Sequence, residues 1–122
     1  MLGLAFELET NNLLDRAFLT KYTVGYEKFK MYLLGESDSK PKNAEWAEKI
    51  CGVSADQIKS IARKISKERT LITVAWSLQR AQNGEQPYWM ATTLAAMLGQ
   101  IGLPGGGDRF WLRSNRWCRN SY

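Results

Sequence analysis

Residues 71–107 read LITVAWSLQRAQNGEQPYWMATTLAAMLGQIGLPGGG, and this stretch decides the fold class. The run at 71–75 is apolar and rich in β-branched residues, which predicts a buried strand. A polar loop that contains a single arginine, Arg80, follows this strand. Pro87 predicts the start of a helix, because its fixed φ suits the first helical turn, and we expect the helix to end near Gly102.

The strand, the loop and the helix together form a unit that α/β proteins commonly use to bind anionic cofactors. Backbone N–H groups and the positive end of the helix dipole gather where the carboxyl end of a strand meets the start of a helix. Arg80 lies in the connecting loop and adds a positive charge there. The sequence therefore indicates a site for an anionic cofactor at the end of this strand.

The part of the chain before this unit is predicted to be helical, and two of its helices carry clear boundary signals. Asn43 is a capping residue for a helix over 44–51, which Gly52 ends. Ser54 and Gln57 form a capping box ahead of apolar residues at helical spacing. Three further helical segments are predicted at residues 2–8, 15–21 and 25–34.

The order of these elements defines the expected architecture. A helix followed by a strand, a loop and a second helix is half of a parallel α/β layer. One strand does not form a stable sheet by itself. We therefore expect an α/β fold, mostly helical with one or two strands, that is a fragment of a larger protein. The alternative is a small helical domain in which residues 71–75 form an isolated extended segment.

The composition excludes several classes of function. The chain has 122 residues, enough for one small domain, and it contains no histidine, which excludes histidine-based metal sites, triads and general bases within it. Cys51 and Cys118 lie too far apart in the sequence for a metal-pair spacing. No segment predicts a membrane span, and no signal peptide is recognisable at Met1.

The net charge of +5 is only a weak indication of nucleic-acid binding, because of where the charge lies. Four arginines against one aspartate give residues 108–122 a net charge of +3, which leaves +2 for residues 1–107. Charges of both signs are interspersed over that larger part, which is typical of a solvated surface. We therefore expect no nucleic acid among the partners.

Several segments match one known family in the same order along the chain. They are LDRAFL (14–19), KYTVGY (21–26), YLLGESD (32–38), EWAEKICGV (45–53), WSLQR (76–80), GEQP (84–87), WM (89–90) and LAAMLGQIGLPGGG (94–107). Through them, residues 1–107 resemble the dimethyl sulfoxide reductase family of molybdopterin oxidoreductases. The subgroup most similar to the chain contains trimethylamine-N-oxide, dimethyl sulfoxide and biotin sulfoxide reductases.

The resemblance implies a large multi-domain α/β reductase, of which this chain is an internal fragment from a Rossmann-like third domain. In this family two molybdopterin guanine dinucleotides bind one molybdenum atom, and the enzyme removes oxygen from a small N-oxide or S-oxide. By their positions in WSLQR, Trp76 and Arg80 are expected beside the pterin and at the substrate funnel.

The side chains of WSLQR suit such a cofactor chemically. The guanidinium of Arg80 is a planar fork that binds a pyrophosphate bidentately. Trp76 offers a flat apolar wall to a ring system, and Ser77 and Gln79 offer short polar contacts. We therefore expect Trp76, Ser77, Gln79 and Arg80 to bind the cofactor.

Three neighbouring residues have structural interpretations instead. Glu85 is a candidate cap for the helix that begins near Pro87. Trp89 and Met90 are expected to pack this helix into the core.

The resemblance also implies what the fragment lacks. The serine that ligates molybdenum in this subgroup comes from another region, so we expect neither a catalytic residue nor a metal ligand here, and the fragment alone is expected to be inactive. The expected partners are the remainder of the reductase chain, the N-oxide or S-oxide substrate and an electron-donating cytochrome or similar redox protein. The parent enzyme is expected in the periplasm, or in the cytoplasm if it resembles biotin sulfoxide reductase, with any export signal far upstream.

Residues 108–122 depart from the family, which continues after Gly107 with a glycine- and aromatic-rich stretch. We interpret them as an aberrant, frameshifted tail. The alternative is a genuine basic and aromatic tail, which would make the chain a small helical binding module that contacts nucleic acid or an acidic partner. A further alternative is a pseudogene product without a function of its own.

Overall fold

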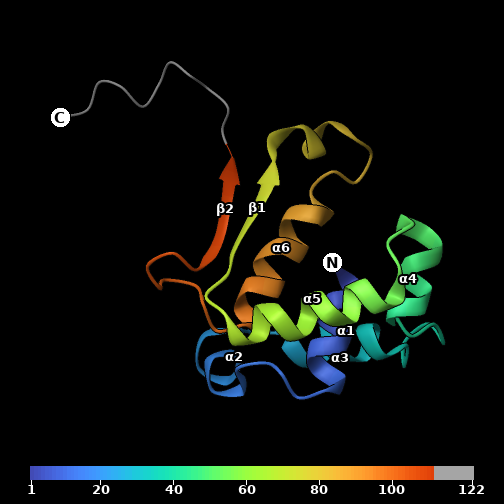
Figure 1. The fold of residues 1–122 in the computed structure, drawn as a ribbon, viewed down its shortest axis with the longest axis horizontal. Helices are drawn as coiled ribbons and strands as arrows, with labels where there is room; N and C mark the ends of the chain where they lie inside the picture. Colours follow the sequence, from blue (N-terminus) through green and yellow to red (C-terminus); the bar gives the residue numbers. More distant parts are fainter. Residues whose placement is uncertain (112–122) are drawn as a thin grey trace.

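The computed structural model describes residues 1–111, and it confirms a mostly helical α/β fold with two parallel strands (Figure 1). In chain order the elements are α1 (Leu2–Thr10), α2 (Arg16–Tyr22), α3 (Tyr26–Leu34), α4 (Ala44–Cys51), α5 (Ala55–Lys67), β1 (Leu71–Ala75), the 3₁₀-helix η1 (Trp76–Arg80), α6 (Gln86–Met97) and β2 (Gly107–Trp111). Helix α6 contacts both strands and also α1 and α2, so it joins the sheet to the helical part of the molecule.

The two strands form a parallel sheet in which Leu71 pairs with Gly107 and Ala75 pairs with Trp111. Parallel strands require a crossover connection, and η1 with α6 supplies it. The sequence pattern did not predict β2 as an element, because residues 108–111 contain charged residues and no β-branched ones. Pairing with β1 gives this segment its extended conformation.

The strand at 71–75 is mostly exposed, so the prediction of a buried strand is wrong. Val74 is buried and Ile72 is half-buried, whereas Leu71 is 43% exposed. Side chains alternate between the two faces of a strand, and α6 packs on the sheet. The residues at 71, 73 and 75 therefore share the face that stays open to solvent.

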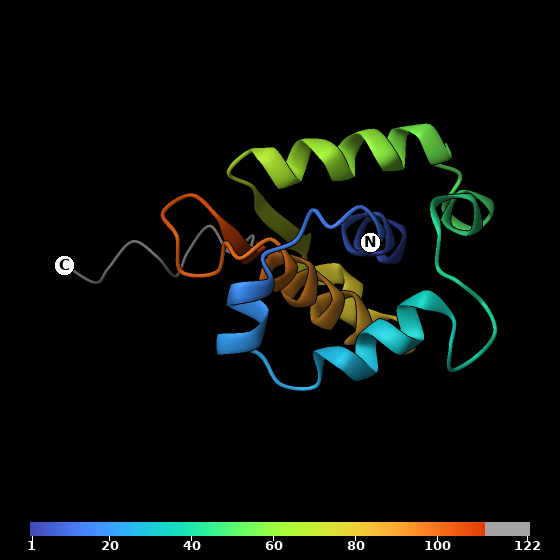
Figure 2. The same cartoon turned by 90° about the horizontal axis from the view of Figure 1, so that it is seen from below.

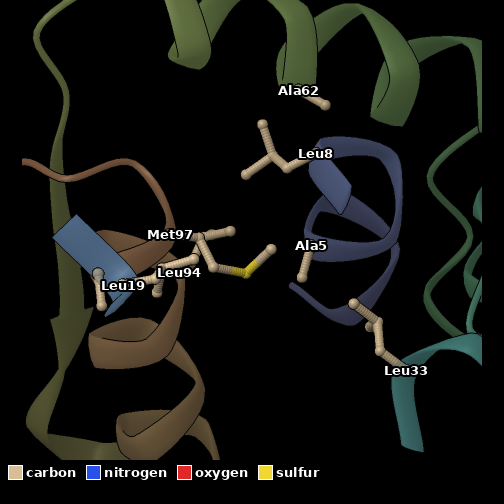
Figure 3. Packing of buried hydrophobic residues seen from close by; sticks show 8 residues of the cluster. Ala5, Leu8, Leu19, Leu33, Ala62, Leu94 and Met97 are labelled. Carbon is tan, nitrogen blue, oxygen red and sulfur yellow. The ribbon is translucent and has the colours of Figure 1, made fainter. Parts of the chain in front are cut away.

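Helix α1 is the centre of the hydrophobic core. It packs against α3, α4, α5 and α6, which surround it in Figure 2. Figure 3 shows Leu8 of α1 pointing toward Ala62 of α5, while Ala5 lies near Leu33 of α3. Met97 of α6 reaches into the same cluster, and its side chain is fully buried. Contacts between segments far apart in the sequence therefore hold the helices together.

The predicted boundary signals of α4 and α5 are confirmed. The side-chain oxygen of Asn43 accepts a hydrogen bond from the Trp46 N–H at 2.8 Å. The Ser54 hydroxyl accepts one from the Gln57 N–H at 3.4 Å. Gly52 ends α4 with a left-handed backbone, at a φ of 72°.

The C-terminus of α6 differs from its predicted position near Gly102. The helix ends at Met97, whose carbonyl oxygen accepts a hydrogen bond of 2.8 Å from the backbone N–H of Asp15. Gly99 follows with a φ of 65°, and a Cβ atom there would lie 2.5 Å from the Asp15 carboxylate. The left-handed backbone of Gly99 therefore ends the helix earlier than Gly102 would.

A buried carboxylate links the first three helices. The Glu9 side chain, 4% exposed, accepts a hydrogen bond of 2.7 Å from the Tyr26 hydroxyl and lies 3.3 Å from both the Arg16 and the Lys30 nitrogen. Burial by itself raises the pKa of Glu9, but the hydrogen bonds from Tyr26, Lys30 and Arg16 outweigh it and lower the pKa below its ordinary value. Burial and the hydrogen bond to Glu9 raise the pKa of Tyr26.

Candidate functional site

The segment WSLQR forms η1 directly after β1, at the position where the sequence analysis expects a site. The first turn of α6 begins at Gln86, with Pro87 as its second residue. The Tyr88 hydroxyl in that turn donates a hydrogen bond of 2.9 Å to the carbonyl oxygen of Ala75, the last residue of β1. The end of the strand, η1 and the start of the helix are therefore held together.

The loop between η1 and α6 folds back tightly onto η1. Gly84 is buried, and a Cβ atom on it would lie 2.6 Å from the backbone of Gln79. The Gly84 N–H donates a hydrogen bond of 3.0 Å to the carbonyl oxygen of Ala81. Only glycine permits this approach, so the loop geometry depends on the residue at this position.

All four expected cofactor-binding side chains lie on the surface at this end of the sheet. Trp76 is 44% exposed, and Ser77, Gln79 and Arg80 are also exposed. Among the described residues, Arg80 makes no ion pair and no side-chain hydrogen bond. Its guanidinium is therefore available to an anionic ligand.

The structure brings two of these four residues together around a shallow cavity of about 410 Å³. We refer to it as the aromatic pocket. It is lined by Trp76, Gln79, Glu85, Tyr88 and Trp89. Ser77 and Arg80 do not line it.

Three of the residues that line the aromatic pocket were not predicted as site residues from the sequence. They are spaced three and four positions apart, which places them on one face at the start of α6: Glu85, Tyr88 and Trp89. This spacing was the signal that could have grouped them. Glu85 occupies the N-cap position, but its side chain makes no capping hydrogen bond, so the expected capping role is not observed.

The expectation that Trp89 packs into the core is wrong, since its side chain is 69% exposed. The buried face of α6 contains Ala91 and Leu94, and a residue two positions before Ala91 lies on the opposite side of a helix. Met90 is half-buried and packs against the core as expected.

Two larger cavities share Trp89 with the aromatic pocket but have a different character. One, of about 830 Å³, lies between the α2–α3 region and α6, and another, of about 600 Å³, lies between the start of α1, α4 and the start of α6. The side chains that line them are apolar or uncharged in the described part of the chain. Apolar surfaces of this kind are typical of packing interfaces, whereas the aromatic pocket combines aromatic rings with a charge.

Within residues 1–111, no group of three or more acidic or cysteine side chains is placed to hold a metal ion. None of the helices in that range has the length and apolar character needed to cross a membrane.

Comparison with known proteins gives the family of this chain. The family model described as molybdopterin oxidoreductase matches residues 8–114, a range that includes η1, α6 and β2. The chain therefore belongs to the molybdopterin oxidoreductase family, as the ordered segments predicted.

Individual relatives agree with this assignment. The chain is 57% identical over 108 residues to the trimethylamine-N-oxide reductase of Pasteurella multocida and 55% identical over 107 residues to that of Haemophilus influenzae. It is 54% identical over 107 residues to the dimethyl sulfoxide/trimethylamine N-oxide reductase of Rhodobacter capsulatus. Each comparison covers 88% of this chain and 13% of the relative, so the chain spans about an eighth of the length of these enzymes.

Proposed function

We propose that this chain is part of a molybdenum-dependent reductase that removes oxygen from a small N-oxide or S-oxide. The observation that carries the proposal is the 54–57% identity to reductases with these names over 88% of the chain. The substrate class is that of the printed names: trimethylamine N-oxide, or a sulfoxide such as dimethyl sulfoxide.

Membership of the family implies a molybdenum–molybdopterin cofactor. We propose the bis(molybdopterin guanine dinucleotide) form, which Trp76, Ser77, Gln79 and Arg80 would help to hold. The donor set fits this group, because the four side chains are exposed at the end of β1 and the guanidinium has no partner among the described residues. When bound, the cofactor supplies the oxygen-atom transfer chemistry.

The roles of the four residues follow from their chemistry. Arg80 binds the pyrophosphate as a bidentate donor, and Ser77 and Gln79 add neutral hydrogen bonds. Trp76 packs against the ring system and borders the substrate funnel together with Arg80. The segment thus binds and orients the cofactor, and the chain alone is inactive because the other binding segments lie outside it.

The wider context of the segment belongs to the same proposal. The two-stranded sheet is part of a Rossmann-like third domain, and the remainder of the reductase chain is its main partner. A cytochrome or similar redox protein donates the electrons. The parent enzyme acts in the periplasm, or in the cytoplasm if it is of the biotin sulfoxide reductase type.

The frameshifted origin of residues 108–122 stays a prediction. Residues 108–111 belong to β2, and residues 112–122 lie outside the described part of the chain. We propose a frameshift after Gly107, and sequencing of the surrounding DNA tests it. A shifted frame that contains a stop codon or no glycine-rich continuation would contradict the frameshift.

Substitution of Arg80 in the full-length, frame-corrected reductase tests the cofactor role. We expect Arg80→Ala to lower the molybdenum and guanine nucleotide content per enzyme and to change the kinetics with trimethylamine N-oxide. Arg63→Ala is the matched control, because Arg63 is an exposed arginine of α5 that lies outside η1 and does not line the aromatic pocket. Unchanged cofactor content and kinetics in Arg80→Ala would remove Arg80 from the site. A loaded enzyme that reduces neither N-oxides nor S-oxides would contradict the proposed reaction.

A further inference from the structure

The aromatic pocket has a composition that differs from that of a phosphate site. Three of its five lining residues are aromatic: Trp76, Tyr88 and Trp89. Glu85 is its one charged side chain, and the lining contains no lysine or arginine among the described residues. An anionic group in this cavity would lie near a carboxylate with no cation of the lining to balance it.

Aromatic rings together with a carboxylate are the groups that recognise a methylated ammonium ion. The faces of indole and phenol rings carry negative electrostatic potential, which attracts a cation whose charge is spread over methyl groups. Tryptophan gives the strongest attraction of this kind, and two of the three rings are tryptophans. Glu85 is the charged side chain of the lining and attracts a cation, whereas the cation of the same loop, Arg80, does not line the cavity.

One wall of the aromatic pocket and the backbone beneath it are held in place before any ligand binds. The Tyr88 hydroxyl is tied to the carbonyl oxygen of Ala75, one residue before Trp76. The contact of Gly84 with the backbone of Gln79 holds η1 against the start of α6. A preformed site avoids the entropy cost of ordering its walls on binding.

We propose that the aromatic pocket binds a methylated ammonium cation between Trp76, Tyr88 and Trp89, with Glu85 balancing its charge. Reduction of trimethylamine N-oxide by two electrons and two protons yields trimethylamine and water. Trimethylamine is an aliphatic amine and is protonated at neutral pH, as a lysine side chain is. The trimethylammonium ion is therefore the physiological ligand, and this last identification rests on the proposed function.

Choline and its neutral analogue 3,3-dimethylbutan-1-ol test the proposal, because they have the same shape and differ in charge. The 122-residue chain is titrated with each compound and followed by tryptophan fluorescence and by the indole N–H signals of Trp76 and Trp89. We expect saturable binding of choline, with the neutral analogue about two- to fivefold weaker. Equal binding of the two compounds would overturn the proposal.

Two substitutions locate the site. Glu85→Gln is expected to weaken choline binding about two- to fivefold, because it removes the charge and keeps the size. Trp89→Leu is expected to weaken it by a similar factor without unfolding the chain, since Trp89 is exposed. Glu68→Gln, an exposed glutamate outside the lining, is expected to bind choline unchanged. Unchanged affinity in Glu85→Gln and Trp89→Leu would contradict the assignment.

A competition experiment separates a cation site from a cofactor site. Inorganic pyrophosphate is expected not to displace choline, and displacement would overturn the proposal. The same titration is carried out on the full-length reductase without molybdenum, in case the 122-residue chain does not fold alone. Absence of choline binding in both proteins would overturn the proposal. The titration requires no turnover, so it is independent of the reductase activity. Failure of choline to bind would contradict the cation site and leave the proposed reaction standing. An enzyme without reductase activity would contradict the proposed reaction and leave the titration result standing.

Discussion

The hydroxyl group of Tyr88 lies 2.9 Å from the carbonyl oxygen of Ala75 and donates a hydrogen bond to it. This bond joins the first turn of α6 to the last residue of β1, across the loop that contains η1. Ala75 directly precedes Trp76 and Tyr88 directly precedes Trp89, and both tryptophans border the aromatic pocket.

Removal of this hydroxyl tests its contribution to stability. We expect Tyr88→Phe to lower the free energy of unfolding by about 1 kcal/mol, because the Ala75 carbonyl loses a donor. Urea unfolding followed by circular dichroism gives the value. Tyr22→Phe is the control, since Tyr22 is 63% exposed and its hydroxyl makes no hydrogen bond among the described residues. Equal losses of unfolding free energy in Tyr88→Phe and Tyr22→Phe would show that the hydrogen bond from Tyr88 to Ala75 does not stabilise the fold.

A side chain at position 84 is expected to displace the loop. A Cβ atom there would lie 2.6 Å from the backbone of Gln79, which neither segment can accommodate without moving. Gly84→Ala should lower the free energy of unfolding by about 1–3 kcal/mol, the usual range for overpacking. It should also shift the indole N–H signal of Trp76 in the NMR spectrum.

The control for this substitution lies in the same loop. Gln82 is exposed, and Gln82→Ala should change the free energy of unfolding by less than about 0.5 kcal/mol. A Gly84→Ala variant as stable as Gln82→Ala would mean that the loop tolerates a side chain at position 84.

The Glu9 carboxylate is expected to make stability depend on pH in the acid range. Its pKa is lower in the folded state than the ordinary value of 4.5, so its contribution is fully present above that value. The contribution is lost as the pH falls from about 4.5 through the lower folded pKa. Near pH 7, Glu9→Gln should lower the free energy of unfolding by about 1–3 kcal/mol, because charged hydrogen bonds are lost.

Unfolding measured from pH 7 to pH 2 checks this dependence. The unsubstituted chain should lose stability below pH 4.5 more steeply than Glu9→Gln does, since the variant has no carboxylate to protonate at this position. Glu36→Gln should follow the unsubstituted chain, because Glu36 is exposed and makes no ion pair among the described residues. Parallel curves for Glu9→Gln and the unsubstituted chain would contradict the role of Glu9.

Truncation of Leu8 tests the centre of the core. Its side chain is fully buried between α1 and α5, facing Ala62 (Figure 3). Leu8→Ala should lower the free energy of unfolding by about 2–5 kcal/mol, as for other buried leucines. Leu103→Ala, at a position that is 46% exposed, should cost about 0.5 kcal/mol or less. Thermal or urea denaturation measures both values. Similar losses of unfolding free energy in Leu8→Ala and Leu103→Ala would place the core elsewhere.

Much of the candidate site followed from local pattern. The end of the strand, the WSLQR segment and the proline-initiated helix lie together as the sequence indicated, and the four expected cofactor residues lie there on the surface. The side chains that complete the aromatic pocket were not grouped in advance. Their grouping depends on how tightly the loop folds at Gly84 and on which face of α6 turns toward the core.

The amino-acid sequence alone specified the features that depend on neighbours a few residues away. Asn43 and Ser54 cap their helices, Gly52 ends α4, and the ordered segments identify the family, because capping bonds and family motifs are local. The folded arrangement decided the rest. Strand β2 exists because residues 107–111 pair with a strand more than thirty positions earlier. The buried carboxylate of Glu9 stays charged because α2 and α3 bring cations to it. Such contacts depend on the packing of whole elements, which no short window of sequence contains.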